Sequence, residues 1–154
     1  MKAHDFYKTD ILETICLILI SSIDQAKPED QSALKFQRFN AKLGTWAVIG
    51  DSEGQILAVY AGLGQGTDDE AIAHVVTKLP AGLYKPMKAL SARAQVLWSL
   101  AQYKFDQYKS SGQEPKQLLM QTDVLPAVLA EAEAIFLVRD LINAPANNMG
   151  PEAL

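Results

Sequence analysis

The sequence predicts an α/β domain with a central mixed β-sheet between layers of helices. Three observations support this fold class. Short runs rich in β-branched residues alternate with segments of helical periodicity, two strand-like segments are close enough for a hairpin, and no repeat or low-complexity tract interrupts the pattern. The 154 residues suffice for one domain with a substantial core, and an apolar fraction of 49% with 21% charged residues is ordinary for a globular protein.

The expected strands are short and apolar. Residues 16–20 form a continuous β-branched run, which predicts a strand buried on both faces in the middle of the sheet. Residues 46–49 and 55–60 flank a glycine-bounded connection and therefore predict an antiparallel hairpin. Residues 117–121 predict a further strand, whereas residues 32–39 fit either a short helix or a strand.

Two segments in the middle of the chain have helical periodicity. Residues 68–79 carry an apolar stripe, and Pro80 and Gly82 end the expected helix. Residues 90–108 repeat apolar side chains every three or four positions. This pattern predicts a helix of about five turns, with Ser91 as its cap and its apolar stripe facing the sheet.

A last helix is expected from Asp123, its N-cap, to about Ile142. Pro126 is tolerated near its start, because N–H groups of the first turn have no partner inside a helix. Pro145 restricts Ala144 to extended backbone, so the chain is expected to turn there. Pro151 and Glu152 have the composition of a helix start, and we expect residues 151–154 to begin an element that continues in a longer protein.

Charge, apolar runs and cysteine content argue against a nucleic-acid-binding, membrane-spanning or secreted protein. A net charge of −4 and a pI near 5.1 give no general attraction to nucleic acid or anionic lipid. No apolar run exceeds six residues, which argues against a membrane span or a secretory leader. Cys16 is the only cysteine, and its apolar neighbours predict a buried side chain. We expect a cytoplasmic protein.

A glycine-rich segment, Gly62-Leu-Gly-Gln-Gly66, lies between a strand and a helix, where backbone N–H groups can bind phosphate. The dinucleotide pattern needs another glycine at Thr67, and no P-loop motif is present. Asp68, Asp69 and Glu70 fill the next helical turn, where they complement the helix dipole and repel an anion. We interpret the segment as a tight turn and the acids as helix-capping groups, not metal ligands.

Histidine and basic residues offer weaker candidates. His4, in a terminus expected to be mobile, and His74 are isolated, so they make neither a zinc site nor a catalytic dyad. Basic residues concentrate in the middle of the chain, with Tyr84, Trp98 and Tyr103 between them. A solvated face is favoured over a nucleic-acid interface. For Trp98, Tyr103, Phe105 and Tyr108, packing in the core or at a domain interface is favoured over a ligand cage. The basic residues are Lys78, Lys85, Lys88, Arg93, Lys104, Lys109 and Lys116.

Two patches resemble the leucine aminopeptidase (cytosol aminopeptidase) family. The run Arg139-Asp-Leu-Ile-Asn-Ala-Pro-Ala-Asn-Asn-Met-Gly-Pro151 is similar to the signature that joins the family's N-terminal and catalytic domains. Ala144 and Asn148 depart from the usual threonine and aspartate. The second patch lies upstream, at about the distance expected for the family's aromatic helix. It consists of Trp98, Leu100, Tyr103, Phe105, Tyr108 and Lys109.

The resemblance implies a non-catalytic N-terminal domain at residues 1–142, similar in fold to macro domains. Residues 143–154 would start the linker to a catalytic domain. It implies a hexameric aminopeptidase that releases N-terminal amino acids with two divalent metal ions, zinc or manganese. The family's lysine-containing glycine-rich motif and Asn-Thr-Asp-Ala-Glu-Gly-Arg motif are absent here. We therefore expect no catalytic, cofactor-binding or metal-binding residue in this chain. The alternative is a macro-domain-like module that binds a nucleotide or nucleic acid.

Overall fold

The computed structural model describes residues 2–10, 13–104 and 114–145. Its strands are β1 (Tyr7–Lys8), β2 (Ile15–Ile20), β3 (Trp46–Gly50), β4 (Ile56–Gly62), β5 (Leu83–Pro86) and β6 (Gln117–Leu119). Its α-helices are α1 (Gln31–Phe36), α2 (Asp68–Val75), α3 (Ala92–Leu100) and α4 (Leu125–Asn143). Short 3₁₀ segments are η1 (Ala3–Phe6), η2 (Ile23–Gln25), η3 (Pro28–Asp30) and η4 (Val76–Lys78).

Within the described residues, six strands form one mixed sheet in the order β1-β6-β5-β2-β4-β3. All neighbouring pairs are parallel except β3 and β4, which form the predicted antiparallel hairpin. β2 lies in the interior of the sheet, between β5 and β4. The predicted central position of this strand is therefore confirmed.

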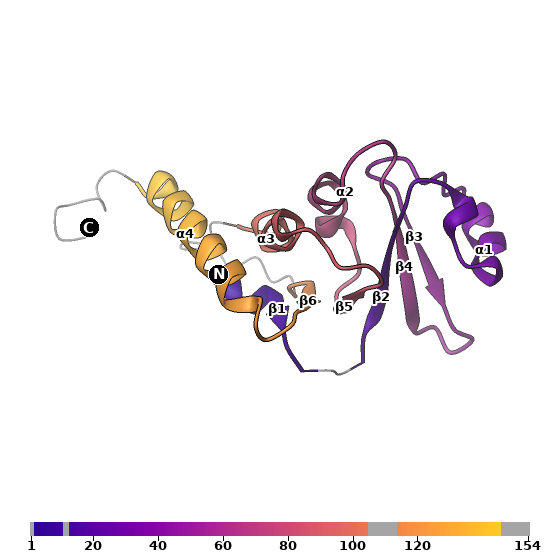
Figure 1. The fold of residues 1–154 in the computed structure, drawn as a ribbon, viewed down its shortest axis with the longest axis horizontal. Coiled ribbons are helices and arrows are strands. Elements are labelled where there is room, and N and C mark those ends of the chain that lie inside the picture. Colours follow the sequence, from indigo (N-terminus) through magenta and orange to yellow (C-terminus); the bar gives the residue numbers. More distant parts are fainter. Residues whose placement is uncertain (1, 11–12, 105–113, 146–154) are drawn as a thin grey trace.

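Helices cover both faces of the sheet, which gives three layers (Figure 1). α2, α3 and α4 follow one another along one face, and α1 lies on the opposite side of the β4–β3 end. We call the cluster under α2, α3 and α4 the large core; its fully buried members include Trp98, Ile72 and Val59. We call the cluster under α1 the small core, which contains Leu34, Tyr60 and five other buried residues. The predicted α/β fold class is confirmed.

Several predicted elements form where the sequence placed them. α2 begins at Asp68, and its helical path continues through η4 to Lys78, just before Pro80. α4 carries Pro126 in its first turn and ends at Asn143, with Ala144 in extended backbone at ψ 135°. For residues 32–39, where helix and strand were both open, the structure has the short helix α1, which ends at Phe36. None of the helices in the described ranges is long and apolar enough to span a membrane.

The expected five-turn helix at 90–108 is wrong, because α3 ends at Leu100. The side chain of Gln102 bonds in both directions with the backbone of Lys116: its Nε2 donates to the carbonyl oxygen and its Oε1 accepts the N–H, each at 2.9 Å. These tertiary bonds replace continuation of the helix. Phe105 and Tyr108 lie outside the described residues.

Other expectations also need correction at the level of single residues. Asp123 does not cap α4, because the N-cap is Val124 and the backbone N–H of Leu125 donates to Gln121 at 3.1 Å. Cys16 is half-buried, not buried. His4 does not belong to a loose end, because the 3₁₀ segment η1 that contains it buries Ala3 and Phe6.

Two strands were not predicted from the sequence. β1 has two residues, so it shows no periodicity. β5 has four residues and contains Pro86, which argues against a strand in sequence-based reasoning. Here Pro86 stands at the end of β5, and the next residue, Met87, supplies an N–H bond to Leu17 in β2. These strands build the left half of the sheet in Figure 1.

Candidate functional site

The glycine turn between β4 and α2 is shaped by close packing. A side chain at Gly62 would come within 2.0 Å of the carbonyl oxygen of Lys42, so only glycine fits there. Gly64 adopts a positive φ of 56°, and its N–H donates to Ala41 at 2.9 Å. The space beside Gly66 is filled by the carboxylate of Glu70. These contacts support the predicted tight turn and leave no open cradle for a phosphate.

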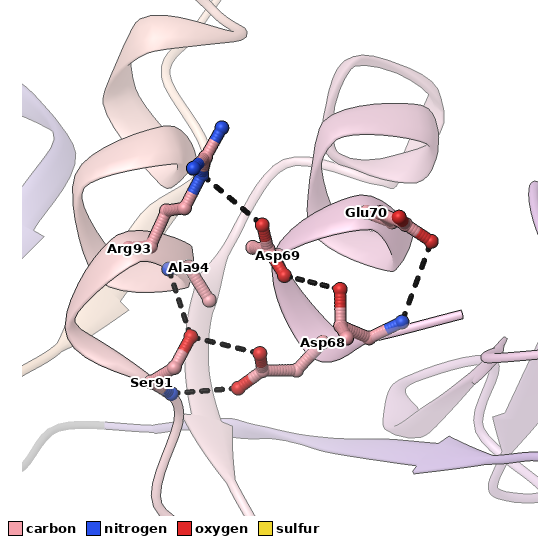
Figure 2. A network of polar contacts seen from close by, with 7 residues as sticks. Asp68, Asp69, Glu70, Ser91, Arg93 and Ala94 are labelled. Carbon is pink, nitrogen blue, oxygen red and sulfur yellow. Dashed lines mark hydrogen bonds and ion pairs between the residues drawn. The ribbon is translucent and has the colours of Figure 1, made fainter.

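The first turn of α2 is closed by its own acidic side chains (Figure 2). The backbone N–H of Thr67 donates to Glu70 Oε2 at 3.4 Å, as in one half of a capping box. The Thr67 hydroxyl donates to Asp69. This hydrogen bond is the main cause that lowers the pKa of Asp69. An anion at this helix end would meet carboxylates instead of free N–H groups.

The third acid of this turn, Asp68, belongs to a different contact. Its carboxylate accepts the backbone N–H of Ser91 at 2.6 Å and the Ser91 hydroxyl at 2.8 Å. The Ser91 oxygen in turn accepts the N–H of Ala94 at 3.1 Å, so Ser91 caps α3 as predicted. Arg93 pairs with Asp69 at 3.2 Å (Figure 2).

We call this set of contacts the α2–α3 fastening. Asp69 and Glu70 both bond to Thr67, Asp69 also pairs with Arg93, and Asp68 bonds to Ser91. Among the described residues, no group of three or more His, Cys, Asp or Glu side chains is placed to hold a metal ion. The acids at 68–70 act here as hydrogen-bond acceptors at the start of α2 and between α2 and α3.

The basic residues divide between the two ends of the sheet. Lys116 precedes β6, and its ammonium group donates to Thr77 at 3.2 Å. Burial, followed by the charge of Lys104, lowers the pKa of Lys116. Lys85 and Lys88 are exposed at the other end, in and after β5. Arg93 is used in the α2–α3 fastening, and Lys109 lies outside the described residues. Among the described basic residues, Lys85 and Lys88 thus lie apart from Lys116 and Lys104, and a solvated face stays the prediction.

The aromatic residues between these cations belong to the large core. Trp98 is fully buried, and its indole N–H donates to the carbonyl oxygen of Lys116 at 2.8 Å. The rings of Tyr84 and Trp98 lie 5.5 Å apart, and the Tyr84 hydroxyl donates to Pro80 at 2.6 Å. The predicted core role of Trp98 is confirmed, and Tyr84 is buried beside it.

A second polar cluster holds the end of α4 against the end of α3. Arg139 donates from Nη1 to the carbonyl oxygen of Leu100 at 2.9 Å, the last residue of α3. The same guanidinium lies over the ring of Tyr103, 5.4 Å from its centroid. The Tyr103 hydroxyl donates to Asp140 at 2.6 Å. We call this cluster the α3–α4 latch. It assigns a structural role to two residues of the signature run, and sequence spacing gave no signal for these long-range contacts.

An open groove of about 920 Å³ lies at the carboxyl ends of β1, β5 and β6. Sequence reasoning missed it because β1 and β5 were not predicted. Its charged side chains, Lys85 and Asp123, are exposed to solvent. Its Gln95 already donates to Leu90 at 3.3 Å, and no buried side-chain polar atom in the described part of the chain lacks a partner. The groove therefore contains no buried polar group that calls for a ligand.

The three-layer fold and its mixed six-stranded sheet, within the described residues, define an α/β domain. The chain belongs to the family described as M17 aminopeptidase, N-terminal domain, whose model matches residues 18–121. This match begins inside β2 and ends two residues after β6. The signature run that begins at Arg139 lies beyond it and is a separate observation.

Solved structures share the fold. The chain superimposes on the cytosol aminopeptidase of Coxiella burnetii with a TM-score of 0.82 and 24% identity, covering 96% of this chain and 35% of that one. It also matches the bottromycin maturation enzyme BotP, with a TM-score of 0.64 and 22% identity, covering 92% of this chain and 35% of BotP. The structure of BotP in complex with Mn gives a TM-score of 0.63 and 21% identity, covering 90% and 34%. The chain thus spans about a third of these proteins. No match is found among curated protein sequences.

Proposed function

We propose that this chain serves as the non-catalytic N-terminal domain of a leucyl-type aminopeptidase that releases N-terminal amino acids from peptides. The family match over residues 18–121 is the observation that carries the proposal. Two divalent metal ions, zinc or manganese, would activate water in the catalytic domain of that enzyme. The polar side chains described here support a non-catalytic role for this domain, because they hold its helices together.

The domain itself would have two architectural roles, which are to cover the catalytic domain and to help assemble a hexamer. We place the domain at residues 1–142 and the junction at residues 143–154, most of which lie outside the described residues. Its partners would be its own catalytic domain and further copies of the enzyme in the cytoplasm. The lone cysteine is compatible with the cytoplasm, where disulfides are rare. The net charge of −4 gives the protein no general attraction to nucleic acid.

Peptidase assays on the purified 154-residue chain test the proposal. With leucyl anilide and either Zn²⁺ or Mn²⁺, we expect no hydrolysis above the metal-only blank. The complete aminopeptidase should hydrolyse the anilide and lose this activity with a chelator. Metal-dependent cleavage by the 154-residue chain alone would refute its non-catalytic role.

Ligand binding separates this proposal from a nucleotide-binding module. A site that binds ADP-ribose would raise the unfolding midpoint as the ligand concentration rises. We expect no such shift, because Glu70 fills the space beside Gly66 and acids surround the start of α2. A salt-dependent gel shift with duplex DNA should also be negative.

A further inference from the structure

The polarity of α4 is inverted over its last two turns. In most surface helices, apolar side chains face the protein and polar side chains face water. Near the end of α4, the polar residues Arg139 and Asp140 turn toward α3 and Tyr103 in the α3–α4 latch. Large apolar side chains face solvent instead: Leu137 is 60% exposed, Val138 53% and Ile142 75%. We call these three residues the outer α4 patch.

The earlier turns of the same helix follow the ordinary rule. Val128, Ala132 and Phe136 are buried against the large core. The exposed positions there are small or charged, among them Ala127 and Glu131. Glu131 lies seven residues before Val138, two turns earlier on the same side of the helix. The change in outer surface from charged to apolar therefore occurs within one continuous helix.

The α3–α4 latch fixes which side of the helix faces outward. Arg139 closes the last carbonyl of α3 and Asp140 accepts the Tyr103 hydroxyl, so a rotation of α4 that buried the outer α4 patch would break both bonds. Breaking them would leave the Leu100 carbonyl and the Tyr103 hydroxyl without these partners. The apolar patch is thus held outward by specific polar contacts, at the point where the chain continues to residues 146–154.

We propose that the outer α4 patch is the docking surface for the catalytic domain that follows this domain in the aminopeptidase. The inference rests on the proposed function. The matched structures are about three times as long as the aligned region, and the patch lies on the last helix of the domain, immediately before the chain leaves it. Burial of three large apolar side chains is a sufficient reason for a domain to dock there instead of being loosely tethered.

Cysteine labelling tests the docking surface directly. In a Cys16→Ala background, Val138→Cys and the matched control Glu131→Cys are prepared both in the 154-residue chain and in the complete aminopeptidase. In the 154-residue chain, a maleimide should modify both variants at similar rates. In the complete enzyme, Val138→Cys should react on the order of tenfold more slowly, whereas Glu131→Cys should keep its rate.

Three outcomes would overturn the docking proposal. The first is equal labelling of the Val138→Cys variant in both proteins. The second is protection of this variant in the 154-residue chain that increases with concentration, which would identify a second copy as the occupant. The third is protection of this variant in the 154-residue chain while the chain is monomeric, which would identify other residues of the same chain as the occupant of the patch. Anilide hydrolysis by the complete protein tests the proposed function separately, so an active enzyme with an unprotected Val138→Cys variant would refute the docking alone.

A substitution gives an independent readout. Ile142→Glu should leave the unfolding midpoint of the 154-residue chain unchanged, because this side chain is 75% exposed there. The same change in the complete enzyme should lower the midpoint and increase proteolysis near the junction. The control Ala127→Glu should have neither effect. An equal response of the two variants in the complete enzyme would contradict the proposal.

Discussion

The two faces of the sheet are stabilised in different ways. On the large-core face, three helices bury an extensive apolar cluster around Trp98, and the α2–α3 fastening lies at its rim. On the small-core face, the six-residue helix α1 covers far fewer apolar side chains. Two polar contacts supplement that burial: Tyr60 bonds to Asp30 at 2.6 Å, and the Gln37 amide bonds to the backbone of Val48. The large-core face also has side-chain hydrogen bonds, but we expect each one to contribute a larger share of the stability on the face with less apolar area.

The largest expected effect is on the large core. Trp98→Ala removes a fully buried ring and the hydrogen bond from its indole to Lys116. We expect a loss of about 3–5 kcal/mol in the free energy of unfolding, measured by urea denaturation. Leu34→Ala in the small core should cost less, about 2 kcal/mol, because α1 can collapse onto the smaller cluster. A larger loss for Leu34→Ala would reverse the proposed ranking of the two cores.

The next effect concerns the hydroxyl of Tyr60. Tyr60→Phe removes its bond to the Asp30 carboxylate and the bond that it accepts from the N–H of Lys27 at 3.3 Å. We expect a cost of about 1–2 kcal/mol, because one partner is charged. Tyr84→Phe in the large core loses one neutral hydrogen bond to Pro80, at 2.6 Å, and should cost less. Equal costs in thermal unfolding would show that the small core does not rely on its polar contacts.

A smaller loss of stability, with a second consequence, is expected at the outer edge of β3. The Gln37 amide donates to Val48 at 2.8 Å and accepts its N–H at 3.1 Å, so it occupies part of an open strand edge. Gln37→Ala should cost about 1 kcal/mol and raise the tendency of the chain to self-associate. Sedimentation at several concentrations would detect this tendency. Gln37→Glu keeps the acceptor but not the donor, and should recover only part of the stability.

Alkaline pH is expected to weaken both faces, with no effect near neutrality. Burial raises the pKa of Tyr7 in the large core to about 12, and burial with the Asp30 hydrogen bond does the same for Tyr60. Free tyrosine in the unfolded chain ionises near pH 10, so above that pH the unfolded state binds fewer protons than the folded state. Stability should therefore fall between about pH 10 and 12. The free energy of unfolding is measured by urea denaturation at several pH values. Tyr7→Phe and Tyr60→Phe should each reduce the slope of this free energy against pH above pH 10. An unchanged slope would contradict the assignment for that residue.

Sequence reasoning predicted the elements whose signals are local. The apolar run of β2, the hairpin around residues 50–54 and the amphipathic α2 all carry their own periodicity. The tight glycine turn was also predictable, because acids at residues 68–70 already indicated a closed helix end. The family resemblance was visible in the residues from Trp98 on, and the family match covers the region from 18 to 121.

Sequence reasoning failed where contacts between distant residues decide the structure. Gln102 ends α3 by bonding to Lys116, a residue fourteen positions away, and no helical propensity reveals this competition. Arg139 bonds to the last carbonyl of α3, a contact between residues 39 positions apart that no local pattern indicates. The outer α4 patch was hidden for the same reason, since an apolar residue in a helix does not by itself show which side faces the protein.

The position of β1 has a consequence for folding during synthesis. β2, β3, β4 and α1 lie within residues 15–62, so this half of the sheet is complete soon after it leaves the ribosome. β1 pairs only with β6, and Gln117 bonds to Asp5 across a separation of 112 residues. The first of the six described strands in chain order can therefore pair only after the last has been synthesised. Until then, the apolar residues Phe6 and Tyr7 lack the strand and helices that bury them, so they stay exposed on the incomplete chain and can favour aggregation.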